Sequence, residues 1–184
     1  MNPIFQTENF RARRLKLADF EAFHEMQGNE RVMRFVRGAA MSFEEDMGEL
    51  NKLIASYDDS DNDFWIFAVE RKEDDRFVGT VALVKSDTHG NTMPEDKLIL
   101  NIKADQCEIG YRLLERFWGR GYAKEIAEGL VQYTKTLGYT RLIACVADEN
   151  TASLKILQSL NFQFKERFIA KDLQIPEQKF ILVL

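Results

Sequence analysis

Residues 107–125 read CEIGYRLLERFWGRGYAKE and join two patterns of different period. From 107 to 114, apolar and polar side chains alternate, which predicts a β-strand. Beyond Gly121 the apolar side chains recur every three to four residues, which predicts a helix. Gly119 and Gly121 lie between the two patterns, where the chain must turn. A strand, a glycine turn and a helix therefore follow one another in this segment.

The glycine turn has two interpretations. A helix that begins after such a turn offers unpaired N–H groups and its positive dipole end to an anion, and Arg116 and Arg120 carry charge suited to phosphate oxygens. Two common phosphate loops do not fit. Gly121 is followed by Tyr122-Ala123 rather than Lys-Ser/Thr, and Lys124 stands where a dinucleotide fingerprint needs a small residue. From these residues alone the segment is either a structural turn or a phosphate cradle.

The rest of the chain supplies further strands and helices. Helices are predicted at 19–26, 42–57, 123–137 and 151–160, and strands at 10–17, 64–70, 76–84, 98–102, 107–114, 141–147, 167–173 and 179–184. The strands at 64–70 and 76–84 should form an antiparallel hairpin. The helix at 123–137 connects two strands that should be parallel. The sequence therefore predicts an α/β (α+β) fold with a mixed sheet, in one domain spanning 1–184.

Three local signals mark helix ends. Ser42 and Glu45 have the spacing of a capping box. Asp19 can cap the start of the helix at 19–26, and Gly138 stands where a left-handed residue is expected after a helix. On the strand at 107–114, the period of two separates two faces: Cys107, Ile109, Tyr111 and Leu113 on one, and Glu108, Gly110, Arg112 and Leu114 on the other.

Composition narrows the class of protein. The chain is 45% hydrophobic and 30% charged, as in globular proteins with a sizeable core. A net charge of -5 argues against a nucleic-acid partner. No apolar run approaches the roughly 18 residues of a membrane span, and the N-terminus lacks the apolar core of a signal peptide. We therefore expect a cytoplasmic protein with neither a nucleic-acid nor a membrane partner.

Cysteines and histidines are scarce. Cys107 and Cys145 are far apart, and buried packing is the expected role of both. His24 and His89 lack the spacing of metal ligands, so no metal site is predicted.

Several short blocks carry a family resemblance. Arg116-x-x-Gly119-x-Gly121 resembles the Gln/Arg-x-x-Gly-x-Gly/Ala signature of the GNAT acetyltransferase superfamily, whose loop holds the pyrophosphate of acetyl-CoA. WGRGYAKE at 118–125 looks like the WGKGYATE version of the ribosomal-protein N-terminal (RimJ/RimL) branch. Further similar blocks follow the family's order, so the resemblance covers nearly the whole chain. They are FVGT at 77–80, EIGY at 108–111, ENTAS at 149–153 and LNF at 160–162.

The resemblance implies a fold and an activity. The fold is a mostly antiparallel sheet of six to seven strands with a central parallel pair and about four helices. The activity is direct transfer of the acetyl group of acetyl-CoA to a primary amine, without a metal. The acceptor is the N-terminal α-amino group of a peptide or protein, or a small amine such as a polyamine, amino sugar or amino acid. A non-catalytic acyl-CoA sensor is the alternative, and the protein is expected to be a monomer or homodimer.

The resemblance also implies site residues. Those expected at the cofactor are Leu113, Leu114, Arg116, Trp118, Gly119, Arg120, Gly121, Tyr122, Ala123, Asn150 and Ser153. Backbone N–H groups near Leu113 and Leu114 are expected to face the oxyanion. Glu108, or a water chain, is the candidate base for the amine, and Ser153 is the candidate acid for the leaving thiolate. The ordinary alternatives are a half-exposed strand residue for Glu108 and helix capping for Ser153 and Asn150.

Two positions depart from the family pattern. Asn161 replaces the usual glycine after the last helix, and it tolerates the same left-handed conformation. Leu157 stands where many members carry a tyrosine that protonates the thiolate, which excludes that acid at this position. The helices at 19–26 and 42–57 and the loop at 86–97 are expected to shape the acceptor site, and they carry no readable motif.

Overall fold

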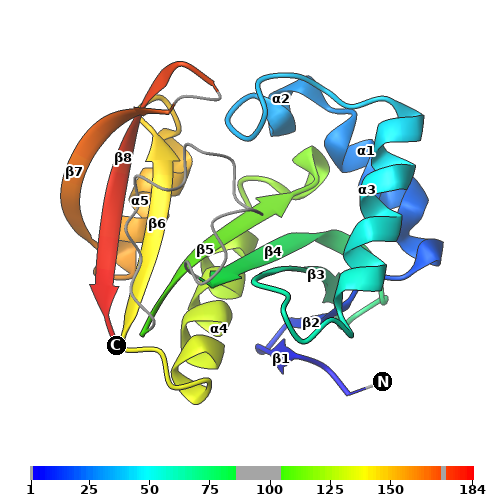
Figure 1. Ribbon diagram of the computed structural model, residues 1–184, viewed down its shortest axis with the longest axis horizontal. Helices are drawn as coiled ribbons and strands as arrows, with labels where there is room; N and C mark the ends of the chain where they lie inside the picture. The colour runs from blue at the N-terminus through cyan, green and yellow to red at the C-terminus, as the bar shows by residue number, and fades with distance from the viewer. Residues whose placement is uncertain (1, 86–104, 171–172) are drawn as a thin grey trace.

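The computed structural model describes residues 2–85, 105–170 and 173–184. Within them, eight strands form one sheet in the order β1-β2-β3-β4-β5-β6-β8-β7 (Figure 1). The strands are β1 (Phe5–Gln6), β2 (Phe10–Arg14), β3 (Phe64–Arg71), β4 (Phe77–Lys85), β5 (Gln106–Leu113), β6 (Arg141–Ala147), β7 (Gln163–Ala170) and β8 (Ile175–Val183). The predicted mixed sheet is confirmed. The strand predicted at 98–102 and the loop at 86–97 lie outside the described residues.

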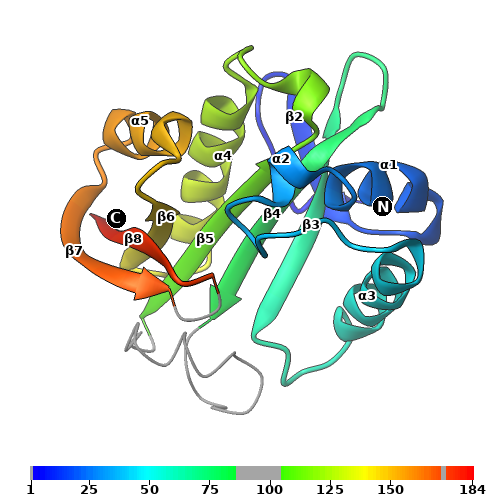
Figure 2. The ribbon, with the colours of Figure 1, turned by 90° about the horizontal axis from the view of Figure 1, so that it is seen from above.

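Helices cover both faces of the sheet. They are α1 (Phe20–Gln27), α2 (Glu30–Met33), α3 (Phe43–Ser56), α4 (Tyr122–Thr136) and α5 (Thr151–Ser159). Short 3-10 turns occupy Leu17–Asp19 and Glu115–Phe117. Helices α4 and α5 lie on one face, named here the α5 face, and α1, α2 and α3 lie on the other, named the α2 face (Figure 2). Fully buried side chains from both layers fill the core, including Phe10, Phe23, Met26, Leu50, Ile126, Leu130, Leu142 and Leu157.

Two short elements were missed from the sequence. Strand β1 has only two residues and adds to the sheet edge by pairing Phe5 with Ala12, which accounts for the eighth strand. Helix α2 has four residues, too few for an apolar period to show, and the side chain of Asn29 caps it by accepting from the N–H groups of Arg31 and Val32.

The helix-end signals mostly hold. The capping box of Ser42 and Glu45 is present, and Gly138 and Asn161 take the left-handed conformation with φ of 85° and 64°. Asp19 precedes α1, but its side chain does not cap that helix. Its buried carboxylate instead accepts two hydrogen bonds of 2.7 Å from Arg13 and one of 2.9 Å from the Lys16 N–H. A guanidinium within reach offers stronger, charge-assisted bonds than a helix N–H does.

The central strands separate along their length. Strands β5 and β6 are parallel, as predicted, but they pair only from 106–108 to 141–143. Strand β5 then stays paired with β4 as far as Leu113. Strand β6 turns away and remains paired with β8 as far as Ala147. Figure 1 shows the two strands diverging. The edge of β5 from 109 to 113 that faces β6 is therefore left out of the sheet's hydrogen-bond ladder.

Candidate active site

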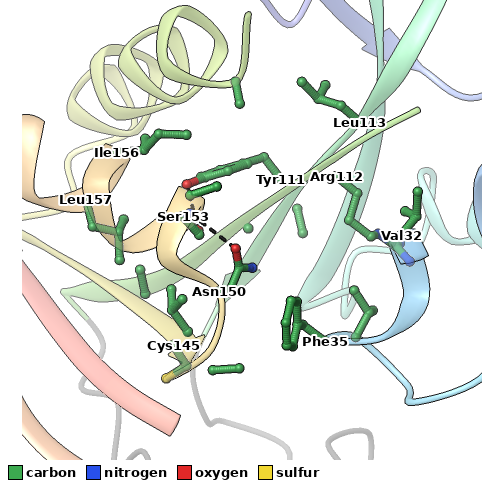
Figure 3. Close-up of a pocket in the computed structure, with 18 of the residues that line it drawn as sticks. Val32, Phe35, Tyr111, Arg112, Leu113, Cys145, Asn150, Ser153, Ile156 and Leu157 are labelled. Carbon is green, nitrogen blue, oxygen red and sulfur yellow. Dashed lines mark hydrogen bonds between the residues drawn. The ribbon is translucent and has the colours of Figure 1, made fainter. Parts of the chain in front are cut away.

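A cavity of about 790 Å³ lies at the divergence of β5 and β6. It is lined on the α5 face by the start of α4, by 144–147 of β6 and by α5. On the α2 face it is lined by α2, by the chain that follows α2 and by β3 and β4. Strand β5 contributes 108–113 and lies between the two halves (Figure 3). The cavity therefore passes through the sheet and opens toward both layers of helices.

The glycine turn forms one end of this cavity. Gly119 and Gly121 have φ of 71° and 80°, which side chains disfavour, and a Cβ added to either would meet no atom within 4 Å. Close packing is thus not the reason for glycine here. The N–H groups of Lys124 and Glu125 donate to the Gly121 carbonyl. The N–H of Tyr122, ahead of them at the helix start, lies in the first turn, where no intrahelical acceptor exists. An open, backbone-lined helix start suits a pyrophosphate.

The aromatic and basic residues of the turn differ in their placement. The Trp118 indole donates a 2.9 Å hydrogen bond to the Leu113 carbonyl, so it braces the turn against the end of β5 while also lining the cavity. Arg116 forms a salt bridge with Glu25 of α1. Arg116 and Arg120 are exposed or half-exposed and do not line the cavity. Tyr122 and Ala123 do line it.

Leu113 and Leu114, both expected to face the oxyanion, lie at the end of β5 with their N–H groups pointing to opposite edges of the strand. The N–H of Leu114 donates a 3.0 Å bond to the Val78 carbonyl, and its side chain is buried outside the cavity lining. The Leu114 N–H is therefore committed to the sheet, and that part of the expectation is wrong. Backbone direction alternates along a strand, so the N–H groups of Leu113 and Tyr111 point toward the divergence with β6.

On the α5 face, two hydroxyl groups meet. Asn150 caps α5 by accepting from the Ser153 N–H at 3.2 Å. The Ser153 hydroxyl lies 2.9 Å from the Tyr111 hydroxyl (Figure 3). Burial raises the pKa of Tyr111, and the hydrogen bond with Ser153 opposes that effect. The phenol thus keeps its proton at neutral pH and can donate it. No role was predicted for Tyr111 beyond its place in the EIGY block.

On the α2 face, Glu108 and Arg112 project from β5 on either side of Gly110. The Glu108 Oε2 atom is buried and has no hydrogen-bond partner, the only such side-chain atom in the part of the chain that the structure describes. Arg112 donates a 2.7 Å hydrogen bond to Gln27 at the end of α1. Burial lowers the pKa of Arg112 to about 10, which still leaves it charged at neutral pH. Arg112 was predicted to share this face, but no role was predicted for it.

The remaining candidates are the two cysteines, a metal site and a membrane-spanning helix. Burial raises the pKa of the Cys107 thiol to about 12, so it is not a nucleophile at neutral pH. Cys145 lines the cavity from β6. Across residues 2–85, 105–170 and 173–184, no three His, Cys, Asp or Glu side chains gather as metal ligands would. Over the same residues, no helix has the length and apolar character needed to cross a membrane.

Comparison with known proteins identifies the family. Residues 9–163 match the family described as Acetyltransferase (GNAT) domain. YoaA of Bacillus subtilis (strain 168), an uncharacterized N-acetyltransferase, is 27% identical over 165 residues, which are 89% of this chain and 84% of that protein.

Two solved structures share the fold at low identity. Spermidine N-acetyltransferase from Vibrio cholerae, in complex with CoA and spermine, has a TM-score of 0.74 at 18% identity and covers 95% of each chain. RimL, a ribosomal L7/L12 alpha-N-protein acetyltransferase in complex with CoA, has a TM-score of 0.77 at 13% identity and covers 100% of this chain and 98% of its own. The chain therefore belongs to the GNAT acetyltransferase family and is an acetyl-CoA-dependent N-acetyltransferase.

Proposed function

We propose that acetyl-CoA lies along the α5 face of the cavity and that a primary amine reaches the acetyl group from the α2 face. One observation carries this arrangement. The same cavity has the open glycine turn at one end and the buried, unpartnered Glu108 carboxylate oxygen on the other face of the sheet. A buried carboxylate oxygen without a donor is costly, which favours a site completed by a bound N–H group.

The cofactor is held by backbone and by α5. The N–H groups at Gly121 and Tyr122 bind the pyrophosphate at the start of α4, where the helix dipole favours negative charge. Asn150 lines the path of the pantetheine arm while it caps α5. Acetyl-CoA supplies an activated acetyl thioester. The N–H groups of Tyr111 and Leu113 face the carbonyl oxygen, where negative charge develops during transfer.

The proton transfers are divided between the two faces. Glu108 accepts the proton of the ammonium form of the acceptor, directly or through one water, so that the amine nitrogen has a free electron pair. The C–N bond then forms as the C–S bond breaks, and the second proton that the acylated nitrogen must lose passes to solvent water. The thiolate takes a proton from the Ser153 hydroxyl, Tyr111 replaces that proton through the 2.9 Å contact, and the Tyr111 phenolate regains a proton from solvent water. Ser153 and Tyr111 together therefore protonate the thiolate, which Leu157, at the position of the family's tyrosine, cannot do.

The acceptor is proposed to be the α-amino group of a peptide or protein N-terminus. The WGRGYAKE turn supports this choice and a place for the chain, as one domain over 1–184, in the RimJ/RimL branch. RimL, an alpha-N-protein acetyltransferase, has the same fold. The second candidate is a small amine, because a spermidine acetyltransferase also shares the fold.

The test has two parts. The melting temperature should rise with CoA and with acetyl-CoA at concentrations far above a micromolar Kd, because ligands that bind only the folded state stabilise it. Thiol release from acetyl-CoA is then measured with a panel of N-terminal peptides, spermidine and amino sugars. Release that depends on an added amine supports the proposal. Stabilisation by CoA with no amine-dependent release would instead identify a sensor.

A further inference from the structure

We propose that Arg112 forms a carboxylate-binding subsite in the acceptor half of the cavity, so that the substrate is an amine that also carries a carboxylate, such as an amino acid or a short peptide. This inference rests on the proposed placement of the acceptor on the α2 face. It favours one class among the acceptors considered above and disfavours polyamines.

The first observation is that no carboxylate contacts the Arg112 guanidinium directly. Arg112 lines the cavity, and its guanidinium forms no salt bridge in the described part of the chain, although the carboxylates of Glu49 and Asp46 act on it electrostatically without direct contact. Its contacts are neutral: the Nη1 atom donates to the Gln27 side chain and lies 3.7 Å from the Met33 sulfur. Arginine has five N–H donors in a planar fork. Most of that fork thus remains for a ligand, and a carboxylate matches it in shape and charge.

The second observation is how the arginine is held. The Gln27 side chain is fully buried; its amide nitrogen donates a 3.1 Å bond to Asp46, and its oxygen accepts from Arg112. Asp46, also fully buried, contacts the His24 ring at 2.5 Å. Gln27 separates the Asp46 carboxylate from Arg112, so the acid orients the arginine through an amide instead of neutralising it by direct contact. The guanidinium is therefore fixed in position with its charge still available.

The third observation is the distribution of charge on this face. Two other arginines line the cavity here, but each is already paired at its edge: Arg31 with Glu115 and Arg34 with Glu149. Glu108 and Arg112 are left as opposite charges on one face of β5, about 13 Å apart between Cα atoms, since a strand rises about 3.3 Å per residue. Gly110 between them keeps the space open. A polyamine would place a second cation toward Arg112, which is unfavourable.

The floor between the two charges is apolar. In register with β5, strands β4 and β3 contribute apolar side chains to the same face of the cavity. These are Ala82, Val84, Phe64 and Ile66, with Phe35 and Val36 from the chain after α2. An acceptor with an apolar body, its amine at Glu108 and its carboxylate at Arg112 matches the cavity in each part.

The experiment compares acids with amides. Leucine, Gly-Leu and Gly-Gly-Leu are titrated calorimetrically into the CoA-bound protein, each as the free acid and as the C-terminal amide, with spermidine as a further ligand. At least one acid should bind about 10- to 100-fold more tightly than its amide, the range of charge-assisted hydrogen bonds. Arg112→Gln should reduce that ratio to near one. Arg34→Gln is the matched control, because it removes a cation that is already paired, and should keep the ratio within about twofold.

The outcomes separate this inference from the proposed function. Two results in the wild type would overturn the carboxylate subsite. One is equal binding of every acid and its amide, and the other is tight binding of spermidine without binding of the acids. Neither result needs the variant to fold. Preferential binding of acids with no thiol release from any amine would leave the subsite supported and contradict catalysis. Arg112→Lys, which keeps the charge without the fork, should retain a part of the preference.

Discussion

At the scale of single residues, the proposed mechanism divides catalysis between Glu108 on one face of β5 and Tyr111 with Ser153 on the other. The two hydroxyls act as a unit because they lie 2.9 Å apart. Ser153→Ala should lower kcat by about 10- to 100-fold, near the lower end of what a general acid contributes, with little change in the KM for acetyl-CoA. Stopped-flow thiol release measures this.

Tyr111→Phe provides the cross-check for the hydroxyl pair. It should lower kcat in the wild-type background and have little further effect when Ser153 is already alanine, because the two act in one chain. If the two losses instead multiply fully in the double variant, the relay from Tyr111 through Ser153 is wrong.

The Tyr57 hydroxyl joins the end of α3 to β3 and to the chain that follows β2. Its O–H donates to the Ile66 carbonyl of β3 and accepts a 2.9 Å bond from the Leu15 N–H, both buried. Tyr57→Phe should cost about 1–3 kcal/mol of unfolding free energy, because it leaves two buried backbone groups unsatisfied. Urea unfolding measures this, and a cost below about 0.5 kcal/mol would show that these bonds contribute little.

The same residue predicts an alkaline limit of stability. Burial raises the pKa of Tyr57 from 10.0 to about 12. Above pH 10 the unfolded chain loses this proton while the folded chain keeps it, so the contribution of Tyr57 is complete below pH 10 and is lost as the pH rises toward 12. Tyr57→Phe should flatten this part of the stability curve.

At the scale of elements, the turn before α4 combines strained backbone with open space. Gly121→Ala should lower the unfolding free energy by about 1–2 kcal/mol, the cost of a left-handed residue with a Cβ, and should reduce the stabilisation that CoA provides. Gly48→Ala in α3 is the matched control. Its added Cβ also meets no atom within 4 Å, but its backbone is helical, so it should gain up to about 1 kcal/mol and leave CoA binding unchanged. Equal CoA stabilisation of both variants would argue against a cofactor cradle at the turn.

Elements with strong local signals could be predicted from the sequence. The capping box at Ser42, the period of α4 and the left-handed Asn161 depend on residues close in the chain, so their structure follows from local chemistry. Two findings could not be predicted: the Glu108 carboxylate oxygen without a hydrogen-bond partner, and the contact of Arg112 with an amide instead of a carboxylate. Both depend on the sheet register and on which helices cover each face. From the sequence, Arg116 is suited to bind phosphate. In the structure it forms a salt bridge with Glu25, because α1 packs beside the turn.

At the scale of the whole molecule, we propose that the divergence of β5 and β6 lets one cavity bind two ligands from opposite faces. The two halves should therefore respond separately to substitution. Ala82→Leu fills the floor of the α2 half and should raise the acceptor KM about tenfold, or about 1.4 kcal/mol, while the CoA-induced rise in melting temperature stays the same. A matching loss of CoA stabilisation would show that the faces are not separate sites.

The most direct test of the account is the pH dependence of acetyl transfer in Glu108→Gln, measured as amine-dependent thiol release. With Glu108 as the base, the variant should be slower by about 100-fold or more near pH 7, within the range of general-base contributions. The deficit should shrink as the pH approaches the pKa of the acceptor amine, since a free amine needs no base. A variant with the wild-type rate and an unchanged pH profile would contradict the central claim that the amine is deprotonated and attacks from the α2 face at Glu108.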